Sequence, residues 1–298
     1  MNRALLVGIN AYPSQPLAGC LADIAGLAAL LLDQGYFAFD EMRMLADGRA
    51  TRRAIGDGLR WLVSGARRGD RLYFHFSGHG AQLPTESPAE VSQVLCPVDF
   101  DWTLKKALSD RDLGVLFGAL ADGVDLTWTV DACHTGDFAR EAALNGQPIR
   151  PRVLRPPPPV AREIGRRLEG HCAVRPLRAP AAERSLMISA CWANETAADT
   201  SREGRAQGAF TSGLIRTLLE PRGKTSPVSA LPSSLSDVLR VFEQHPFGDG
   251  PPAMMARAFL GASPQDASAR ESLAQSAGRF DFDAPRSAAV GASALCCA

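Results

Sequence analysis

Short apolar runs alternate with amphipathic helical patterns along much of this chain, and that alternation limits its fold more than any other feature. Residues 3–9 and 71–76 are apolar runs of strand length, typical of strands buried on both faces. Between them, residues 21–34 repeat apolar side chains at helical spacing, and Gly35 suits the end of that helix. Alternating strands and helices predict an α/β fold with a mostly parallel sheet and helices on both faces.

The remaining elements follow from the same patterns. Thr51 is a suitable N-cap for a helix that carries Ile55, Leu59 and Leu62. Further strands are expected at residues 41–46, 125–130, 185–191 and 254–260, and further helices at residues 112–121, 160–168, 210–219 and 234–243.

A change of composition divides the chain. Residues 141–184 are rich in proline and arginine and keep no periodic apolar pattern, which indicates a long exposed linker. We expect a large catalytic part at 1–140, this linker at 141–184, a smaller part at 185–261 and a disordered tail at 262–298. Both structured parts are expected to share one sheet.

Charge and cysteine usage exclude several classes of function. The formal net charge is zero, so neither nucleic acid nor a membrane surface is an expected partner. The start of the chain has no signal-peptide pattern, and no apolar stretch is long enough to span a membrane, so we expect a cytoplasmic protein. The seven cysteines form no CxxC pair, so no metal site and no cofactor are predicted.

Two predicted strands end in reactive side chains. His79 follows the strand at 71–76, and Cys133 follows the strand at 125–130. Ligands of parallel α/β sheets bind beyond the carboxyl ends of the strands, so neighbouring strands would bring imidazole and thiol together. An imidazole can take the thiol proton and leave a nucleophilic thiolate, which predicts Cys133 as nucleophile and His79 as general base. The backbone N–H groups of Gly80 and Cys133 are candidates for an oxyanion hole.

Each residue alone has a plainer interpretation. A single buried cysteine is most often a small apolar side chain, and a histidine in a glycine-rich turn is usually structural. Their joint occurrence directly after two apolar strands favours catalysis. The rival histidines are less suitable, because His75 lies within a strand and His134 follows the nucleophile.

The motifs YFHFSGHGAQ and TVDACHTG resemble the two catalytic motifs of metacaspases and their bacterial relatives. ALLVGINAY, GCLADIAGLAALL, CPVDF, LSDRDL, SACWANETAAD and GAFTSGLIRTLLE also follow the order of that family, over about residues 3–260. The resemblance implies a caspase-like three-layer sandwich and a cysteine endopeptidase that acts on proteins or peptides.

The resemblance also implies an acidic pocket for arginine or lysine before the cleaved bond. Its matching positions here are Cys20, Asp23, Ser77 and Asp131. Two carboxylates suit a guanidinium, which can form paired charge-assisted hydrogen bonds. Asp23 alone would also suit the first turn of a helix, and Asp131 alone could support the turn beside His79.

Many metacaspases are calcium-activated, and the resemblance identifies the corresponding positions. They are Ser92, Asp110, Arg111 and Arg140, with Asp112 and Asp137 close by. Calcium prefers several hard oxygen ligands, and two guanidinium groups would repel it. We therefore expect activity without calcium.

The arginines of the linker are expected sites of self-processing. Proline follows Arg150, Arg155 and Arg175, which makes those bonds poor substrates. The better candidates for autocleavage are Arg162, Arg166, Arg167, Arg178 and Arg184.

Two other functions remain open. A catalytically silent scaffold of the same fold is one, although His79, Cys133 and both pocket carboxylates are present. A flavodoxin-like nucleotide-binding module is the other, although no phosphate-binding glycine motif follows any strand.

Overall fold

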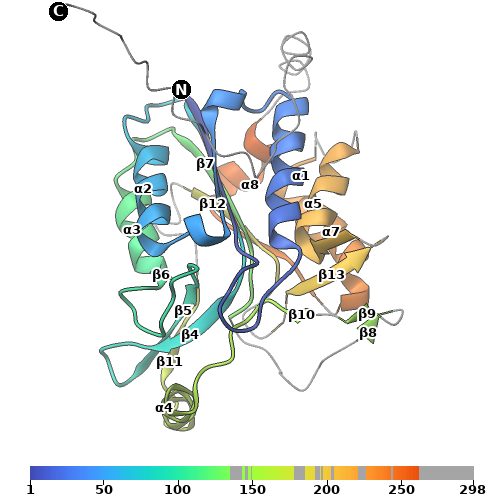
Figure 1. Cartoon of the computed structure of the whole chain (residues 1–298). Helices are drawn as coiled ribbons and strands as arrows, with labels where there is room; N and C mark the ends of the chain where they lie inside the picture. Colours follow the sequence, from blue (N-terminus) through green and yellow to red (C-terminus); the bar gives the residue numbers. More distant parts are fainter. Residues whose placement is uncertain are drawn as a thin grey trace, which may run out of the picture.

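A six-stranded sheet forms the centre of the computed structural model (Figure 1), with five parallel strands and one antiparallel edge strand. The structure describes residues 1–134, 143–144, 147–148, 150–177, 185–191, 195, 197–202, 205–220, 226–242 and 244–261. In spatial order the strands are β15 (Phe247–Asp249), β12 (Ser185–Ser189), β7 (Asp125–Asp131), β3 (Arg71–Ser77), β1 (Asn2–Gly8) and β2 (Met42–Ala46).

The alternation of side chains along each strand creates two cores, one on each face of this sheet. On β1, Leu5 belongs to a core with Ile55 of α2 (Arg52–Val63), whereas Leu6 belongs to a core with Ile24 of α1 (Cys20–Asp33). Successive strand residues point to opposite faces, so both faces must be apolar and both must be covered. Figure 1 shows α2 and α3 (Asp110–Gly118) on one face, and α1, α5 (Ala209–Leu219) and α7 (Leu231–Leu239) on the other. The predicted three-layer α/β fold is confirmed.

Local signals place the two long helices as predicted. The Thr51 side chain accepts a hydrogen bond from the Ala54 N–H at 3.2 Å and caps α2. Beyond α1, Gly35 has a φ of 67°, a left-handed conformation that glycine adopts at little cost.

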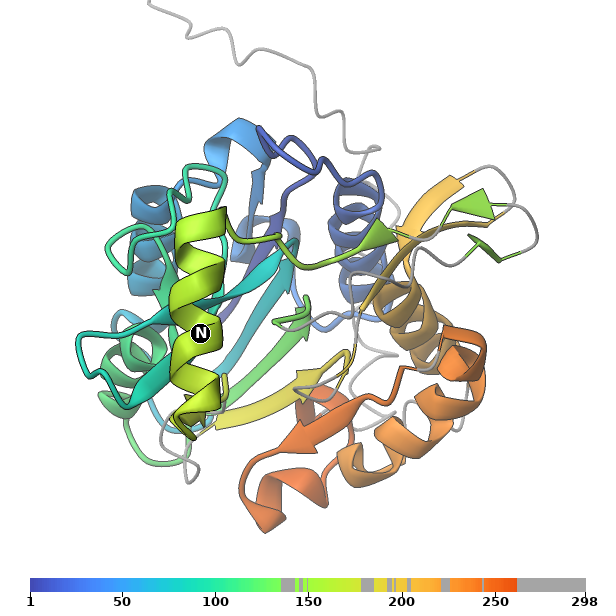
Figure 2. The ribbon, with the colours of Figure 1, turned by 90° about the horizontal axis from the view of Figure 1, so that it is seen from below.

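Smaller sheets lie beyond the carboxyl ends of the central strands. One contains the hairpin of β4 (Gly80–Pro84) and β5 (Glu90–Leu95), with β6 (Leu108–Ser109) and β11 (Ala173–Arg175) beside β5. Figure 2 shows α4 (Pro158–Glu169) lying across this region. The other sheets are formed by β10 (Arg150–Pro151), β13 (Ala198–Arg202) and β14 (Arg205–Gly208), and by β8 (Ala143–Leu144) and β9 (Gln147–Pro148).

The structure differs from the sequence prediction at two segments. The strand expected at 254–260 was wrong, because β15 is the last strand of the described residues and is followed by the short helix α8 (Pro252–Met255). Pro251 and Pro252 explain the difference, since proline is well suited to the first turn of a helix.

Residues 141–184 also contain more structure than the predicted exposed linker. Strands β8 to β11 and helix α4 fall within this segment, and Val153 and Leu154 are buried. The division of the chain into parts remains a prediction, and the tail at 262–298 lies outside the described residues. Among the helices described, none is long and apolar enough to cross a membrane.

Candidate active site

The register of the central sheet brings His79 and Cys133 to the same edge. Strands β3 and β7 are parallel neighbours, and Ser77 pairs with Asp131 at their carboxyl ends. His79 and Cys133 each follow two residues later, so the two predicted catalytic residues leave the sheet side by side.

Three contacts fix the orientation of His79. Its Nε2 lies 2.7 Å from the Gln15 carbonyl oxygen, and its backbone N–H donates to the Tyr12 hydroxyl at 2.9 Å. The Tyr12 ring packs against the imidazole with ring centroids 4.6 Å apart. A proton on Nε2 would satisfy the Gln15 carbonyl and leave Nδ1 as the base, and Nδ1 is buried without a hydrogen-bond partner among the described residues.

Burial keeps this imidazole neutral. It lowers the pKa of His79 to about 4; the hydrogen bond with the Gln15 carbonyl acts in the opposite direction, and the nearby Arg152 charge acts in the same direction as burial. At neutral pH His79 is therefore an unprotonated base. His134 is not a second candidate, because its Nδ1 lies 3.0 Å from the Val94 carbonyl oxygen and its ring is enclosed.

The Cys133 thiol donates to the carbonyl oxygen of Glu195. The thiol of Cys191 lies 3.7 Å from the same carbonyl oxygen. Its hydrogen bond with Cys133, followed by burial, raises the pKa of Cys191. Cys191 is thus a neutral thiol beside the predicted nucleophile.

The predicted acidic pocket is occupied by an arginine of the same chain. Arg152 is completely buried, with a side-chain exposure of 0%. Its Nη2 lies 2.7 Å from Asp23 Oδ2 and 3.0 Å from Asp199 Oδ1, and its Nη1 lies 3.1 Å from Asp131 Oδ2. Nη1 also donates to the Ser77 hydroxyl oxygen at 2.7 Å. Three carboxylates therefore surround one guanidinium.

Further contacts hold these carboxylates in place. Asp131 Oδ2 accepts hydrogen bonds from the Thr211 backbone N–H at 3.0 Å and from its hydroxyl at 2.6 Å. Burial, followed by repulsion from Asp23, raises the pKa of Asp131 to about 6, although Arg152 acts in the opposite direction. A buried carboxylate that shares a single cation with two other acidic groups is harder to ionise, which agrees with the raised pKa. Cys20 is buried beside the pocket, and burial raises the pKa of its thiol.

The backbone of Arg152 is held as firmly as its side chain. Its carbonyl oxygen accepts hydrogen bonds from the backbone N–H groups of Gly80 and Cys133, each at 3.1 Å. Its own N–H donates to the Ala197 carbonyl at 2.9 Å. The two N–H groups predicted as an oxyanion hole thus converge on the carbonyl of the residue whose side chain fills the acidic pocket.

Several residues of this site were missed from the sequence. Asp199 lies within the quoted motif SACWANETAAD, but the motif does not reveal that its carboxylate reaches the pocket. Gly208 likewise begins the quoted motif GAFTSGLIRTLLE, but the motif does not reveal that this glycine lies against the pocket. A Cβ at this position would lie 2.3 Å from Asp131 Oδ2 and 2.7 Å from Arg152 Nη2, so the pocket needs a residue without a side chain.

The structure distributes the linker arginines differently from the prediction. The predicted cleavage candidates Arg162, Arg166 and Arg167 lie on helix α4, whereas Arg152 directly follows strand β10. Arg178 and Arg184 lie outside the described residues. Arg152 was not among the better candidates, yet it is the arginine that the structure places in the pocket.

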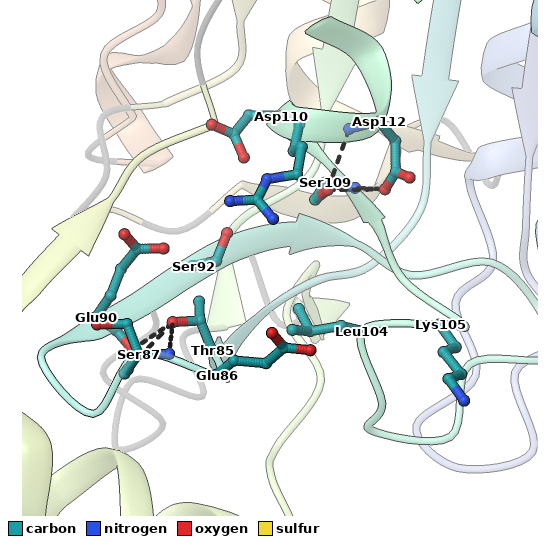
Figure 3. A pocket seen from close by; sticks show the side chains of 11 residues that line it. Thr85, Glu86, Ser87, Glu90, Ser92, Leu104, Lys105, Ser109, Asp110 and Asp112 are labelled. Carbon is teal, nitrogen blue, oxygen red and sulfur yellow. Dashed lines mark hydrogen bonds between the residues drawn. The ribbon is translucent and has the colours of Figure 1, made fainter. Parts of the chain in front are cut away.

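A second hollow includes most of the positions examined for calcium. Figure 3 shows this pocket of about 470 Å³ between the β4–β5 hairpin and the start of α3. Its lining includes Ser92, Asp110, Arg111 and Asp112. Both carboxylate oxygens of Asp112 are engaged, one by Arg52 and the other by the Ser109 N–H and hydroxyl.

The lining of this pocket carries both signs of charge, with carboxylates from Glu86, Glu90, Asp110 and Asp112 and cations from Lys105 and Arg111. Ser92 contributes a neutral hydroxyl, which is a weaker ligand for calcium than a carboxylate. Within the described ranges, no group of three or more His, Cys, Asp or Glu side chains could hold a metal ion. Arg140 lies outside those ranges.

A caspase-like α/β sandwich with thiol and imidazole at adjacent strand ends defines the class of cysteine-type peptidases. Residues 2–140 match the family model described as the metacaspase, peptidase C14 domain. Over these residues the chain is similar to the metacaspase-like proteins of this peptidase family.

Individual metacaspases show the same similarity. Metacaspase-3 of Trypanosoma cruzi is 34% identical over 73% of this chain and 62% of its own length. Metacaspase-3 of Arabidopsis thaliana is 31% identical over 73% of this chain and 59% of its own length. The chain thus spans about three fifths of these two relatives. Among solved structures, protein GSU0716 from Geobacter sulfurreducens matches with a TM-score of 0.61 and 26% identity, over 87% of this chain and 98% of that one.

Proposed function

We propose that this protein is a cysteine endopeptidase that cleaves proteins or peptides after arginine, with Cys133 and His79 as its catalytic dyad. The observation that carries the proposal is the position of Arg152. Its guanidinium lies among Asp23, Asp131 and Asp199, while its carbonyl accepts from two backbone N–H groups beside the thiol. A substrate arginine would use the same contacts.

The chemistry follows from the groups that surround this carbonyl. His79 takes the thiol proton, and the Cys133 sulfur attacks the carbonyl carbon. The Gly80 and Cys133 N–H groups stabilise the oxyanion, and protonated His79 gives its proton to the leaving amine. Water, activated by neutral His79, then hydrolyses the thioester. This step regenerates the Cys133 thiol and releases a peptide with arginine at its new carboxyl terminus.

The pocket favours arginine over lysine. A planar guanidinium offers several N–H donors, and three carboxylates and the Ser77 hydroxyl surround Arg152 here. Lysine has one ammonium on a thinner stem, so it would engage fewer of these acceptors. Aspartate would place a fourth carboxylate in the pocket, and we expect no cleavage after it.

We also propose that the chain cleaves itself between Arg152 and Val153. Arg152 enters the pocket as a substrate residue would, which supports this bond over those after Arg162, Arg166 or Arg167. The Cys133 thiol is hydrogen-bonded to the Glu195 carbonyl in this arrangement. The thiol must therefore rotate toward His79 before it attacks. Until then Arg152 blocks the pocket and keeps the enzyme latent.

The substrate preference is tested with peptides that differ only before the cleaved bond. We expect cleavage after arginine, weaker cleavage after lysine and none after aspartate, with the same rates in excess chelator as in millimolar calcium. Cys133→Ala and His79→Ala should each abolish turnover, and the double variant should be little worse because the two groups act as a unit. Cleavage after aspartate, or an active Cys133→Ala protein, would contradict the proposal, and strong calcium stimulation would contradict calcium independence.

Self-processing is tested by intact mass and amino-terminal sequencing. The wild type should yield a fragment that begins at Val153, whereas Cys133→Ala and Arg152→Gln should remain whole at this bond. Arg162→Gln is the matched control, because it removes an exposed arginine on α4 and should leave cleavage after Arg152 intact. A wild type that is active while all its molecules stay intact would refute self-processing.

The rival function is a catalytically silent scaffold in which Arg152 closes the pocket permanently. It predicts that no arginine peptide is cleaved and that a thiol-reactive peptide ending in arginine fails to label Cys133, even in Arg152→Gln. Labelling of Cys133 in that variant would exclude the rival.

A further inference from the structure

The chain that follows Arg152 is seated in the site as closely as Arg152 itself. Val153 is 2% exposed and belongs to the same buried cluster as Cys133. Leu154 is 5% exposed and belongs to the opposite cluster, which includes Ala81. Two consecutive aliphatic side chains are therefore buried on opposite sides, as in an extended strand.

The backbone on both sides of the proposed cleaved bond contacts one residue. The Gly80 N–H donates to the Arg152 carbonyl at 3.1 Å, and the Gly80 carbonyl accepts from the Leu154 N–H at 3.0 Å. These bonds form a parallel bridge between Gly80 and Val153. Gly80 has little room for a side chain, since a Cβ there would lie 2.3 Å from the Cys133 carbonyl oxygen.

A third contact connects this segment to the catalytic histidine. The Arg155 N–H donates to Gln15 Oε1 at 3.3 Å, while the Gln15 backbone carbonyl lies 2.7 Å from His79 Nε2. Gln15 has a φ of 56°, an unusual value for a residue other than glycine. Strained backbone of this kind is often retained at functional sites.

We propose that the enzyme recognises two aliphatic residues directly after the cleaved bond, and that Gln15 binds the backbone of the third. This inference rests on the proposed cleavage after arginine and adds the substrate class: arginine followed by two residues such as valine and leucine. Charged residues at these two positions are disfavoured, because they would lose water without gaining a partner. Proline at the second position is also disfavoured, because it lacks the N–H that donates to Gly80.

Internally quenched peptides with the sequence of residues 147–152 test the inference, with Arg150 replaced by glutamine to leave one cleavage site. They continue with Val-Leu-Ala, Asp-Ser-Ala or Val-Pro-Ala. We expect kcat/KM for the first peptide to exceed that for either other peptide about tenfold or more. An aminocoumarin amide of the same six residues reports arginine cleavage without any residue after the bond.

A second measurement tests Gln15. Gln15→Ala should lower kcat/KM for the Val-Leu-Ala peptide about 3- to 10-fold more than for the aminocoumarin amide, because only the peptide offers an N–H to the amide oxygen. Gln15→Glu keeps an acceptor oxygen, so its kcat/KM for the Val-Leu-Ala peptide should recover most of what Gln15→Ala loses.

The outcomes separate the inference from the function on which it rests. If the aminocoumarin amide is hydrolysed but the three peptides are cleaved with equal kcat/KM, the inference is overturned and cleavage after arginine stands. An equal effect of Gln15→Ala on both substrate types overturns the role of Gln15. If no arginine substrate is cleaved, the proposed function fails, and the inference fails with it.

Discussion

A buried guanidinium among three carboxylates is the residue-scale feature that explains this site. Arg152 and Asp131 are completely buried, so neither charge would be tolerated without the other. Pairing does not make such a cluster strongly stabilising, because desolvation offsets much of the attraction. On our proposal, the cluster is a binding arrangement for arginine that the chain occupies with its own residue. Burial, followed by repulsion from Asp23, raises the pKa of Asp131 to about 6 although Arg152 acts against it.

Gly208 provides a residue-scale test of the pocket. Gly208→Ala should reduce kcat/KM for arginine peptides about 10- to 100-fold and suppress self-cleavage, because overpacking of this kind costs about 1–3 kcal/mol. The new Cβ would lie 2.3 Å from Asp131 Oδ2.

Gly118→Ala is the matched control, since a Cβ at that position meets no atom within 4 Å. Kinetic measurements on both variants, with circular dichroism to check folding, distinguish the effects. A folded Gly208→Ala protein with wild-type kinetics would show that substrate arginine does not bind where Arg152 lies.

At the scale of elements, α4 and β11 hold the chain that follows Arg152. The Arg167 guanidinium of α4 donates to the backbone carbonyls of Thr85, Ser87 and Glu90 at 3.0, 2.7 and 2.8 Å. Strand β11 pairs with β5 in parallel. On the other side of the bond, β10 pairs with β13. In the uncleaved chain, the segments on both sides of the bond between Arg152 and Val153 are therefore anchored by neighbouring strands.

Arg167→Ala should lower the free energy of unfolding by about 2 kcal/mol, because a hydrogen bond that involves a charged group contributes about 1.5–3 kcal/mol. We expect a lower unfolding midpoint and faster proteolysis within α4 and the β4–β5 hairpin. Arg166→Ala is the control, because Arg166 is 65% exposed and pairs with Glu163 alone among the described residues. Equal effects of the two substitutions would contradict this role of Arg167.

At the scale of the whole molecule, three enclosed histidines make the fold sensitive to acid. Burial lowers the pKa of His75 to about 3 and the pKa values of His79 and His134 to about 4. The unfolded chain binds these protons near pH 6.5, whereas the folded chain does not. The neutral imidazoles therefore do not lower the free energy of unfolding above pH 6.5, but they lower it increasingly as the pH falls toward 4. The raised pKa of Asp131 acts in the opposite direction, since that group favours the folded state as the pH falls through 6.

Stability should therefore fall between pH 7 and pH 5, by about 1.4 kcal/mol per pH unit for each histidine below pH 6.5. Urea unfolding of Cys133→Ala, which cannot cleave itself on our proposal, measures the free energy at each pH. His75→Asn should weaken the dependence on pH, whatever its effect at pH 7.5. His171→Asn should not, because His171 is exposed. Stability that is constant from pH 7.5 to pH 5 would contradict the prediction.

The sequence predicted the fold and the edge of the sheet that holds the site. Apolar runs and helical periodicity depend on which residues must leave water, and this property can be read locally. The central strands other than the last, and helices α1, α2 and α5, were predicted for that reason. His79 and Cys133 were identifiable because a strand end can be located without tertiary contacts. The family resemblance added Asp23, Ser77 and Asp131.

Only the tertiary structure decided which arginine occupies the pocket. Composition assigned all the linker arginines to exposed chain, because periodicity cannot detect one extended residue that is buried by contacts with distant elements. Arg152 meets Asp23, which is 129 positions away along the chain, and Asp199, which is 47 positions away. The space left by Gly208 also exists only between folded elements. The sequence by itself determined the sheet and the position of the pair that we propose as catalytic, whereas the occupant of the pocket depends on contacts made only when the chain has folded.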